Sequence, residues 1–156
     1  SPKASFYRLV IETRGSSTYA NYFFAKGDIS FWNVGFRNFY NIDYADFVNV
    51  SGRFGFYNCA FAKSASVNYA FRQLRAVPGT YVVENTYGLL NVYGSSAYIT
   101  FVRNLKSSNP QVDADFNILE TGWQHAGTGA NLDGTQAHIG VHGGPYAWGS
   151  GAYPAY

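Results

Sequence analysis

The chain has 156 residues, of which only 13% are charged while 19% are aromatic. Eleven Lys and Arg against nine Asp and Glu leave a formal net charge of +2, too little for a surface that neutralises nucleic-acid phosphates. No apolar run is long enough for a membrane-spanning helix. The length favours a single domain over residues 1–156, and we expect neither a nucleic-acid partner nor a membrane span.

Taken in chain order, short apolar and aromatic runs separated by turn residues predict a series of β-strands. The first run would place Tyr7, Leu9 and Ile11 on one face, and a LysGlyAsp turn at residues 26–28 follows the second. We expect strands over residues 6–13, 19–25, 29–34, 48–56, 81–85, 89–93, 98–103 and 112–120.

Residues 19–61 hold 15 of the 30 aromatic residues, interleaved with Asn and Gly. Near-alternating aromatic residues are typical of a pleated, half-buried sheet. The alternation is most regular over residues 48–56, where Val48, Val50 and Phe54 would share one face. We interpret this block as the scaffold of the protein rather than as its functional site.

Residues 66–77 allow two interpretations. A helix is favoured by Ser66 as its cap, by the spacing of Val67, Phe71 and Leu74, and by the ProGly pair that follows. A strand that leads into a ProGly hairpin explains the same residues. Both alternatives stay open for this segment.

The predicted fold class is all-β, an antiparallel β-sandwich or barrel of the jelly-roll kind, because short strands recur at close, regular intervals with turn residues between them. Residues 35–41 and 52–58 both begin with Gly and end in PheTyrAsn, 17 residues apart. A match of this length in a chain so rich in Gly, Phe and Asn does not by itself predict a repeat architecture.

The single cysteine, Cys59, cannot form an intrachain disulfide, and its strand-like surroundings predict a small buried residue rather than an interchain bridge. The chain is poor in Lys and Glu and rich in Asn, Ser, Thr, Tyr and Gly. This composition is more typical of extracellular or particle-surface proteins than of cytosolic enzymes.

The three histidines lie in the Gly-rich segment over residues 122–156. His138 and His142 are weak metal-ligand candidates, because they would face each other only on a helix, and in a strand they would lie about 13 Å apart. We expect no metal and no cofactor. Asp133 precedes a glycine in AsnLeuAspGlyThr, which indicates a hairpin turn more than a calcium loop.

Glu84 and Glu120 are weak catalytic candidates for the paired carboxylates that glycoside hydrolysis requires. GlyThrTyrValValGluAsn at residues 79–85 resembles the strand that carries the nucleophile of small jelly-roll xylanases, and GluThrGlyTrp from Glu120 resembles the strand that carries their acid. At the nucleophile's place this chain has Thr80, so the resemblance implies no complete catalytic pair. An enzyme is therefore the less favoured interpretation.

Aromatic residues of the Gly-rich segment are better candidates for ligand binding. A ring on a loop, with polar side chains nearby, can stack on a sugar while its rim forms hydrogen bonds. The predicted ligand-binding residues are Trp123, His125, Asp133, Tyr146 and Trp148. The alternative is that these rings pack over the end of the fold or against a neighbouring subunit.

Three functions follow in order of preference. The first is a self-assembling structural subunit of an extracellular filament, sheath or particle coat, a homo-oligomer or polymer held by β-sheet and aromatic contacts, because low charge and many rings leave apolar surface for a partner. The second is a lectin-like domain that binds glycans through its loop aromatics. The third is a jelly-roll glycoside hydrolase.

Overall fold

A computed structural model describes residues 3–12, 21–25, 27–37, 45–49, 53–62, 71–72, 81–88, 92–93, 99–104 and 111–149. These residues form twelve β-strands. Their bounds are β1 Lys3–Tyr7, β2 Val10–Glu12, β3 Asn21–Ala25, β4 Asp28–Trp32, β5 Gly35–Arg37, β6 Ala45–Asn49, β7 Phe54–Tyr57, β8 Ala60–Phe61, β9 Phe71–Arg72, β10 Tyr81–Glu84, β11 Val92–Tyr93 and β12 Ile99–Val102. The described residues include no helix with the length and apolar character to cross a membrane.

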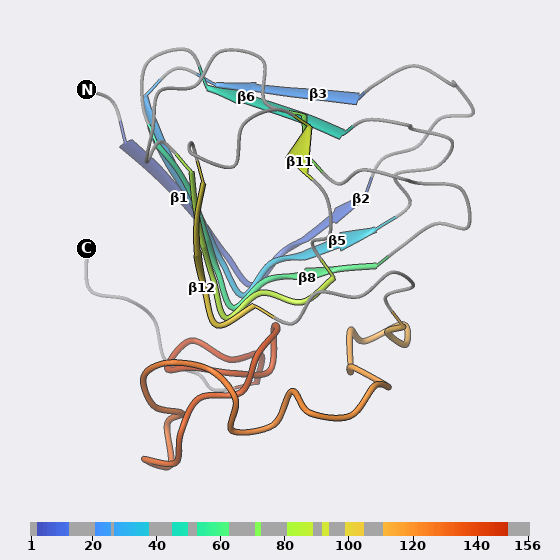
Figure 1. Cartoon of the computed structure of the whole chain (residues 1–156), viewed down its shortest axis with the longest axis vertical. Coiled ribbons are helices and arrows are strands. Elements are labelled where there is room, and N and C mark those ends of the chain that lie inside the picture. The colour runs from blue at the N-terminus through green and yellow to red at the C-terminus, as the bar shows by residue number, and fades with distance from the viewer. Residues whose placement is uncertain are drawn as a thin grey trace.

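The strands stack in parallel to form a β-helix, in which the chain winds in successive coils around a triangular core (Figure 1). A five-stranded sheet in the order β1-β4-β7-β10-β12 forms one side, and a three-stranded sheet in the order β2-β5-β8 forms the second. The third side carries the pairs β3-β6 and β9-β11, with β9 beside β6. Every pairing between these strands is parallel, so the prediction of an antiparallel sandwich or barrel is wrong.

The first coils repeat at a constant sequence step, and this step is not the one between the two PheTyrAsn matches. Ser5 pairs with Ser30 at a separation of 25 positions, and Phe6 pairs with Phe31 at the same step. The same step relates PheTrpAsnValGlyPhe from Phe31 to PheTyrAsnCysAlaPhe from Phe56. Alternation of apolar and polar residues defines which face of a strand is buried, but it does not define the direction of the neighbouring strand. The strand direction was therefore outside what the alternation could predict.

Several predicted strands break at the corners of the coil. Residues 6–13 are divided at Arg8, whose left-handed backbone (φ 51°) separates β1 from β2. Residues 48–56 are not one strand, because β6 ends at Asn49 and β7 begins at Phe54 on another side of the coil. Residues 112–120 form a single antiparallel bridge between Val112 and Ile118. Within residues 66–77 the structure describes only β9, and the remainder of that prediction lies outside the described residues.

The core is a stack of aromatic rings from equivalent positions of successive coils. Phe31 stacks on Phe6 and on Phe56, with ring centroids 5.4 and 5.0 Å apart, and Phe36 stacks on Phe61 at 4.5 Å. Cys59 is fully buried beside them, as the sequence predicts, and burial raises the pKa of its thiol to about 12. The aromatic block is therefore the scaffold.

Residues 111–149, here called the docked segment, lie outside the corner between the five-stranded and three-stranded sheets (Figure 1). A second apolar cluster joins this segment to the coil. Its buried members are Ala60, Tyr87, Phe116, Ile118, Ile139 and Val141. The Gly-rich end of the chain therefore packs along the coil rather than adding strands to its sheets.

We expect Phe56→Ala to lower the free energy of unfolding by about 3–5 kcal/mol, because it removes a fully buried ring from the middle of the stack. Leu119→Ala is the control, since 62% of the Leu119 side chain is exposed and its loss should change stability by about 0.5 kcal/mol or less. Denaturant titration measures both variants. Equal losses for the two would contradict the ring stack as the core.

Candidate functional site

The outer face of the five-stranded sheet carries the most developed candidate site. Alternate residues of a strand point to opposite faces, so the residues that flank the buried Phe6, Phe31 and Phe56 point outward. The parallel register aligns them in three rows across β1, β4 and β7. The rows are Lys3, Asp28 and Arg53; Ser5, Ser30 and Gly55; and Tyr7, Trp32 and Tyr57.

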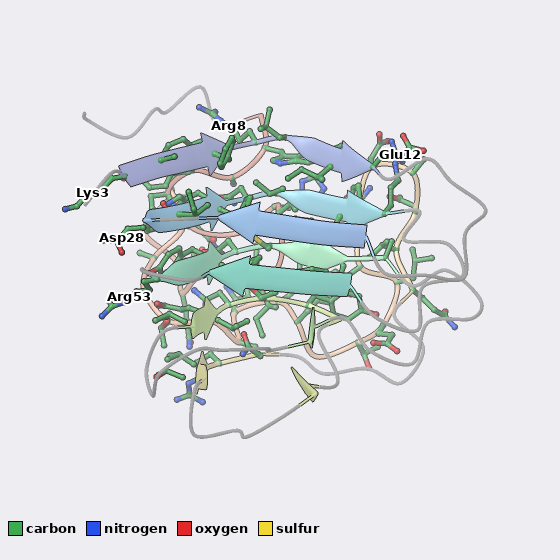
Figure 2. All side chains as sticks on the ribbon, turned by 90° about the horizontal axis from the view of Figure 1, so that it is seen from above. Lys3, Arg8, Glu12, Asp28 and Arg53 are labelled. Atoms are coloured by element: carbon green, nitrogen blue, oxygen red, sulfur yellow. The ribbon has the colours of Figure 1, made fainter. Side chains whose placement is uncertain are left out.

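The charged row lies at the beginning of the three strands, where Figure 2 shows Lys3, Asp28 and Arg53 along one edge of the molecule. The Asp28 carboxylate accepts a hydrogen bond of 3.0 Å from the backbone N–H of Arg53. The Arg53 side chain is exposed. This row therefore offers two cationic groups with a fixed carboxylate between them.

The middle row borders a cavity of about 350 Å³ on this face. The Ser5 and Ser30 hydroxyls are hydrogen-bonded to each other at 2.7 Å, and Gly55 continues their row without a side chain. The polar groups around the cavity belong to Lys3, Ser5, Asp28, Ser30, Arg53 and Tyr57. Donors and acceptors thus surround one open space on a rigid sheet.

The third row is a stack of aromatic rings. Trp32 stacks on Tyr57 with ring centroids 4.0 Å apart and on Tyr7 at 6.3 Å. Tyr146 of the docked segment meets Tyr7 and Trp32 edge-on, at 6.0 and 5.6 Å. The Tyr57 ring leans over Gly55, where an added Cβ would overlap Tyr57 Cε2. Glycine therefore allows this ring to form a wall of the cavity.

Partial burial is the main cause that raises the pKa of the Tyr57 phenol. The nearby Arg53 charge opposes this shift, and the Glu84 charge adds to it. The phenol consequently stays protonated at neutral pH and keeps its O–H as a hydrogen-bond donor beside the cavity.

The docked segment is held by asparagines at the coil corners. Asn33, Asn58 and Asn85 have left-handed backbones (φ 53°, 50° and 48°), which Asn tolerates better than most residues. Their side chains are buried and donate to backbone carbonyls of the segment. Asn33 Nδ2 reaches the carbonyls of residues 141 and 143 at 2.9 and 2.7 Å, and Asn58 Nδ2 reaches that of residue 138 at 2.8 Å. The segment is thereby fixed beside the aromatic row.

At the third corner the pairing runs in both directions. Asn85 Nδ2 donates to the Thr128 carbonyl at 2.8 Å, and the Thr128 N–H donates to Asn85 Oδ1 at 2.7 Å. Close approach is needed along this seam, since a Cβ on Gly143 would overlap the His138 carbonyl oxygen. The tight packing explains why glycine is needed at this contact.

The structure disperses the predicted ligand-binding residues along the docked segment. Trp148 donates from Nε1 to the Asn33 carbonyl at 2.5 Å, and the half-buried Trp123 packs against the second apolar cluster. The exposed Asp133 accepts hydrogen bonds from Thr135 within its own turn. Of the predicted residues described so far only Tyr146, through its contacts with Tyr7 and Trp32, lies beside the outer-face site.

The histidines form two separate local arrangements. The His125 N–H donates to His138 Nδ1 at 2.9 Å, with the two rings 4.5 Å apart, whereas His142 Nε2 lies 2.9 Å from the Asp115 carbonyl. In the part of the chain that the structure describes, no three or more His, Cys, Asp or Glu residues are grouped as metal ligands would be. The pKa of His138 is lowered, mainly by burial and then by the nearby His125 charge, against an opposing effect of Asp133.

Glu84 and Glu120 take part in different hydrogen-bond networks. Glu84 Oε1 accepts from the Thr128 hydroxyl at 2.5 Å. Glu120 Oε2 accepts from the Tyr87 hydroxyl at 2.6 Å. Each carboxylate is thus engaged by a hydroxyl group of the protein, at separate places along the contact between coil and docked segment.

Sequence reasoning missed the outer-face residues Lys3, Ser5, Ser30, Trp32 and Arg53. The signal for them was present in the regular spacing of SerPheTyr, SerPheTrp and GlyPheTyr in β1, β4 and β7. That spacing brings residues far apart in the sequence into one row. No protein-family model, curated protein or solved structure matches this chain.

We expect Asn58→Gly to weaken the attachment of the docked segment by about 1–3 kcal/mol, because glycine keeps the left-handed backbone but leaves the buried His138 carbonyl without its donor. Asn58→Ala should cost more, by about 1–2 kcal/mol of backbone strain. Hydrogen exchange across residues 111–149 measures the effect, with the exposed Gln124→Ala as control. Unchanged protection in Asn58→Gly would contradict the anchoring role.

The lowered pKa of His138 predicts a pH-dependent stability. In the unfolded chain His138 binds a proton near its ordinary pKa of 6.5, whereas in the folded protein it does so only at lower pH. Its stabilising contribution is therefore complete above pH 6.5 and decreases as the pH falls from there through the folded pKa. Unfolding free energies between about pH 7.5 and 5 should fall in the parent protein and fall less in His138→Gln. Identical pH profiles would contradict this assignment.

Proposed function

We propose that this protein binds glycans on the outer face of its five-stranded sheet. The observation that carries the proposal is the juxtaposition of the polar cavity with the row of stacked rings, Tyr7, Trp32 and Tyr57. Both features lie on the same three strands and follow from the same register. The predicted lectin-like role is thus kept, and its site is transferred from the loop aromatics to the sheet.

The mixture of groups around the cavity fits a sugar. A saccharide offers hydroxyls that both donate and accept hydrogen bonds, together with apolar C–H faces that favour aromatic neighbours. The Ser5 and Ser30 hydroxyls can donate and accept, the Asp28 carboxylate accepts, and the Arg53 guanidinium donates. Tyr57 provides the apolar wall and a phenolic O–H. A purely apolar ligand would leave these polar groups without partners.

The dimensions and rigidity of the face also support binding of a short stretch of glycan. The cavity volume of about 350 Å³ lies at the lower end of small-molecule sites, and its open form suits a stretch within a longer chain. The binding groups project from hydrogen-bonded parallel strands, so little conformational freedom is lost when a ligand is bound. The neighbouring rings of Tyr146 and Trp32 extend the contact surface along the strands.

The other predicted functions keep the standing of predictions. Self-assembly needs a surface that meets a second copy, which the glycan site itself does not provide. Hydrolysis needs an acid and a second carboxylate together at the ligand. Glu84 borders Tyr57 on the outer face, while Glu120 is bound to Tyr87 beneath the docked segment. We therefore propose binding without a catalytic step.

The test is isothermal titration calorimetry with a panel of neutral and acidic oligosaccharides. For the glycan that binds, Arg53→Ala should weaken the affinity about tenfold or more, because a hydrogen bond from a charged group contributes about 1.5–3 kcal/mol. Tyr57→Ala should weaken it to a similar extent. Thr100→Ala is the matched control, since Thr100 is exposed on the same sheet and does not line the cavity.

Two results would overturn the proposal. One is the absence of heat with every class of sugar at millimolar concentration. The other is a glycan whose affinity is unchanged in Arg53→Ala and Tyr57→Ala while Trp123→Ala abolishes it, which would return the site to the loop aromatics.

A further inference from the structure

The first coil, made of β1, β2 and β3, exposes residues whose counterparts one coil later are buried. Phe6 is in register with Phe31, yet Phe6 is partly exposed and Phe31 is fully buried. The Leu9 side chain is 43% exposed, whereas Val34, its counterpart one coil later, is 0% exposed. Each inner residue is covered by the coil that precedes it. The first coil thus ends in a surface that further stacking would cover.

The same end also offers backbone hydrogen-bonding groups. Among the described strands β1 has a neighbour, β4, on one side only, and β2 has only β5. Val10, 40% exposed on β2, is in register with the buried Gly35 of β5. An open strand edge next to exposed apolar side chains is a template for pairing with another strand. This end of the β-helix therefore combines both requirements for association.

The sequence of β1 is complementary to itself when two copies pair in antiparallel orientation about Ser5. In that register Ala4 of each copy lies opposite Phe6 of the other, so a small side chain faces a large one on the inner face. On the outer face Lys3 lies opposite Tyr7, where its ammonium can approach the ring face that Trp32 leaves uncovered. Ser5 lies opposite Ser5. Every pair in this arrangement is favourable or neutral.

We propose that the first coil is a docking surface for a second copy of this chain, in a two-fold dimer that pairs the two β1 strands in antiparallel orientation about Ser5. The interface is isologous, since the same surface is used by both copies, and it closes without further growth. The pairing continues the five-stranded sheet across the two-fold axis into its counterpart in the second copy. The two outer-face cavities then lie on one extended sheet.

The closed dimer is favoured over a head-to-tail filament by the difference between the two ends. Ile29 pairs with Phe54, whereas Tyr81 pairs with Ile99 after a visibly smaller step along the sequence. The final coil is therefore shorter than the first ones and does not match the first coil in length. In addition, Thr100 and Val102 of β12 supply no aromatic or charged partner for Lys3.

Cysteine crosslinking tests the register directly. In an antiparallel pair the opposed Cα atoms lie about 4.5–5.5 Å apart, within the range of about 4.4–6.8 Å that a disulfide requires. Ser5→Cys should therefore form a covalent dimer under mild oxidation, at micromolar concentration. Thr100→Cys, exposed on the far strand of the same sheet, is the matched control and should stay monomeric on a non-reducing gel. The buried Cys59 is protected from forming this bond.

Sedimentation of the full chain supplies the second readout. The parent protein should sediment as a dimer, and Leu9→Ser should shift the equilibrium at least tenfold toward monomer. Leu132→Ser should leave it unchanged, because Leu132 is 57% exposed but belongs to the docked segment. A monomer at all concentrations, open-ended filaments, or equal crosslinking of Ser5→Cys and Thr100→Cys would each overturn the proposal.

Discussion

At the corner between the five-stranded and three-stranded sheets the chain turns through one residue with a left-handed backbone, and the rest of the structure depends on this turn. In the inner coils that residue is asparagine, at positions 33, 58 and 85. Its backbone ends one strand and starts the next, while its buried amide reaches out of the coil to carbonyls of the docked segment. A single residue type thus sets the shape of the coil and attaches the part of the chain that covers it.

The constant length of the first coils converts sequence spacing into surface chemistry. The same step along the sequence repeats the corner and also aligns the outward residues of β1, β4 and β7. Identical or similar residues stack on the inside, where Phe6, Phe31 and Phe56 form the core. On the outside the same register groups the hydroxyls of Ser5 and Ser30 beside the space that Gly55 leaves. The proposed glycan site is therefore a consequence of coil stacking, and so is the open end that we propose as a dimer surface.

The sequence alone was sufficient for the strand content and for the role of the aromatic block, because alternation in a strand reports which side chains are buried. It was insufficient for the topology, since the direction of pairing depends on contacts between residues a full coil apart. The motif shared by Phe31 and Phe56 carried that information, but a shorter match ending at Asn41 and Asn58 was compared instead. The candidate site was missed for the same reason.

Loop composition was also a weak guide to the site. Trp123 and Trp148 were predicted to meet a ligand because they stand among glycines, yet glycines of this segment allow close packing against the corner asparagines. Tyr146 is the exception, since its ring reaches the outer face and contacts Trp32. Aromatic residues on a Gly-rich segment can cover a scaffold as readily as they bind a sugar, and only the three-dimensional contacts distinguish the two.

The central claim is that ligand binding takes place on the five-stranded sheet. Backbone amide shifts recorded by NMR during titration with a bound oligosaccharide test it most directly. The account predicts that the largest changes map to Ser5, Ser30 and Gly55, with residues 123–138 nearly unchanged. Changes confined to Trp123, His125 and Asp133, with a silent sheet, would contradict it.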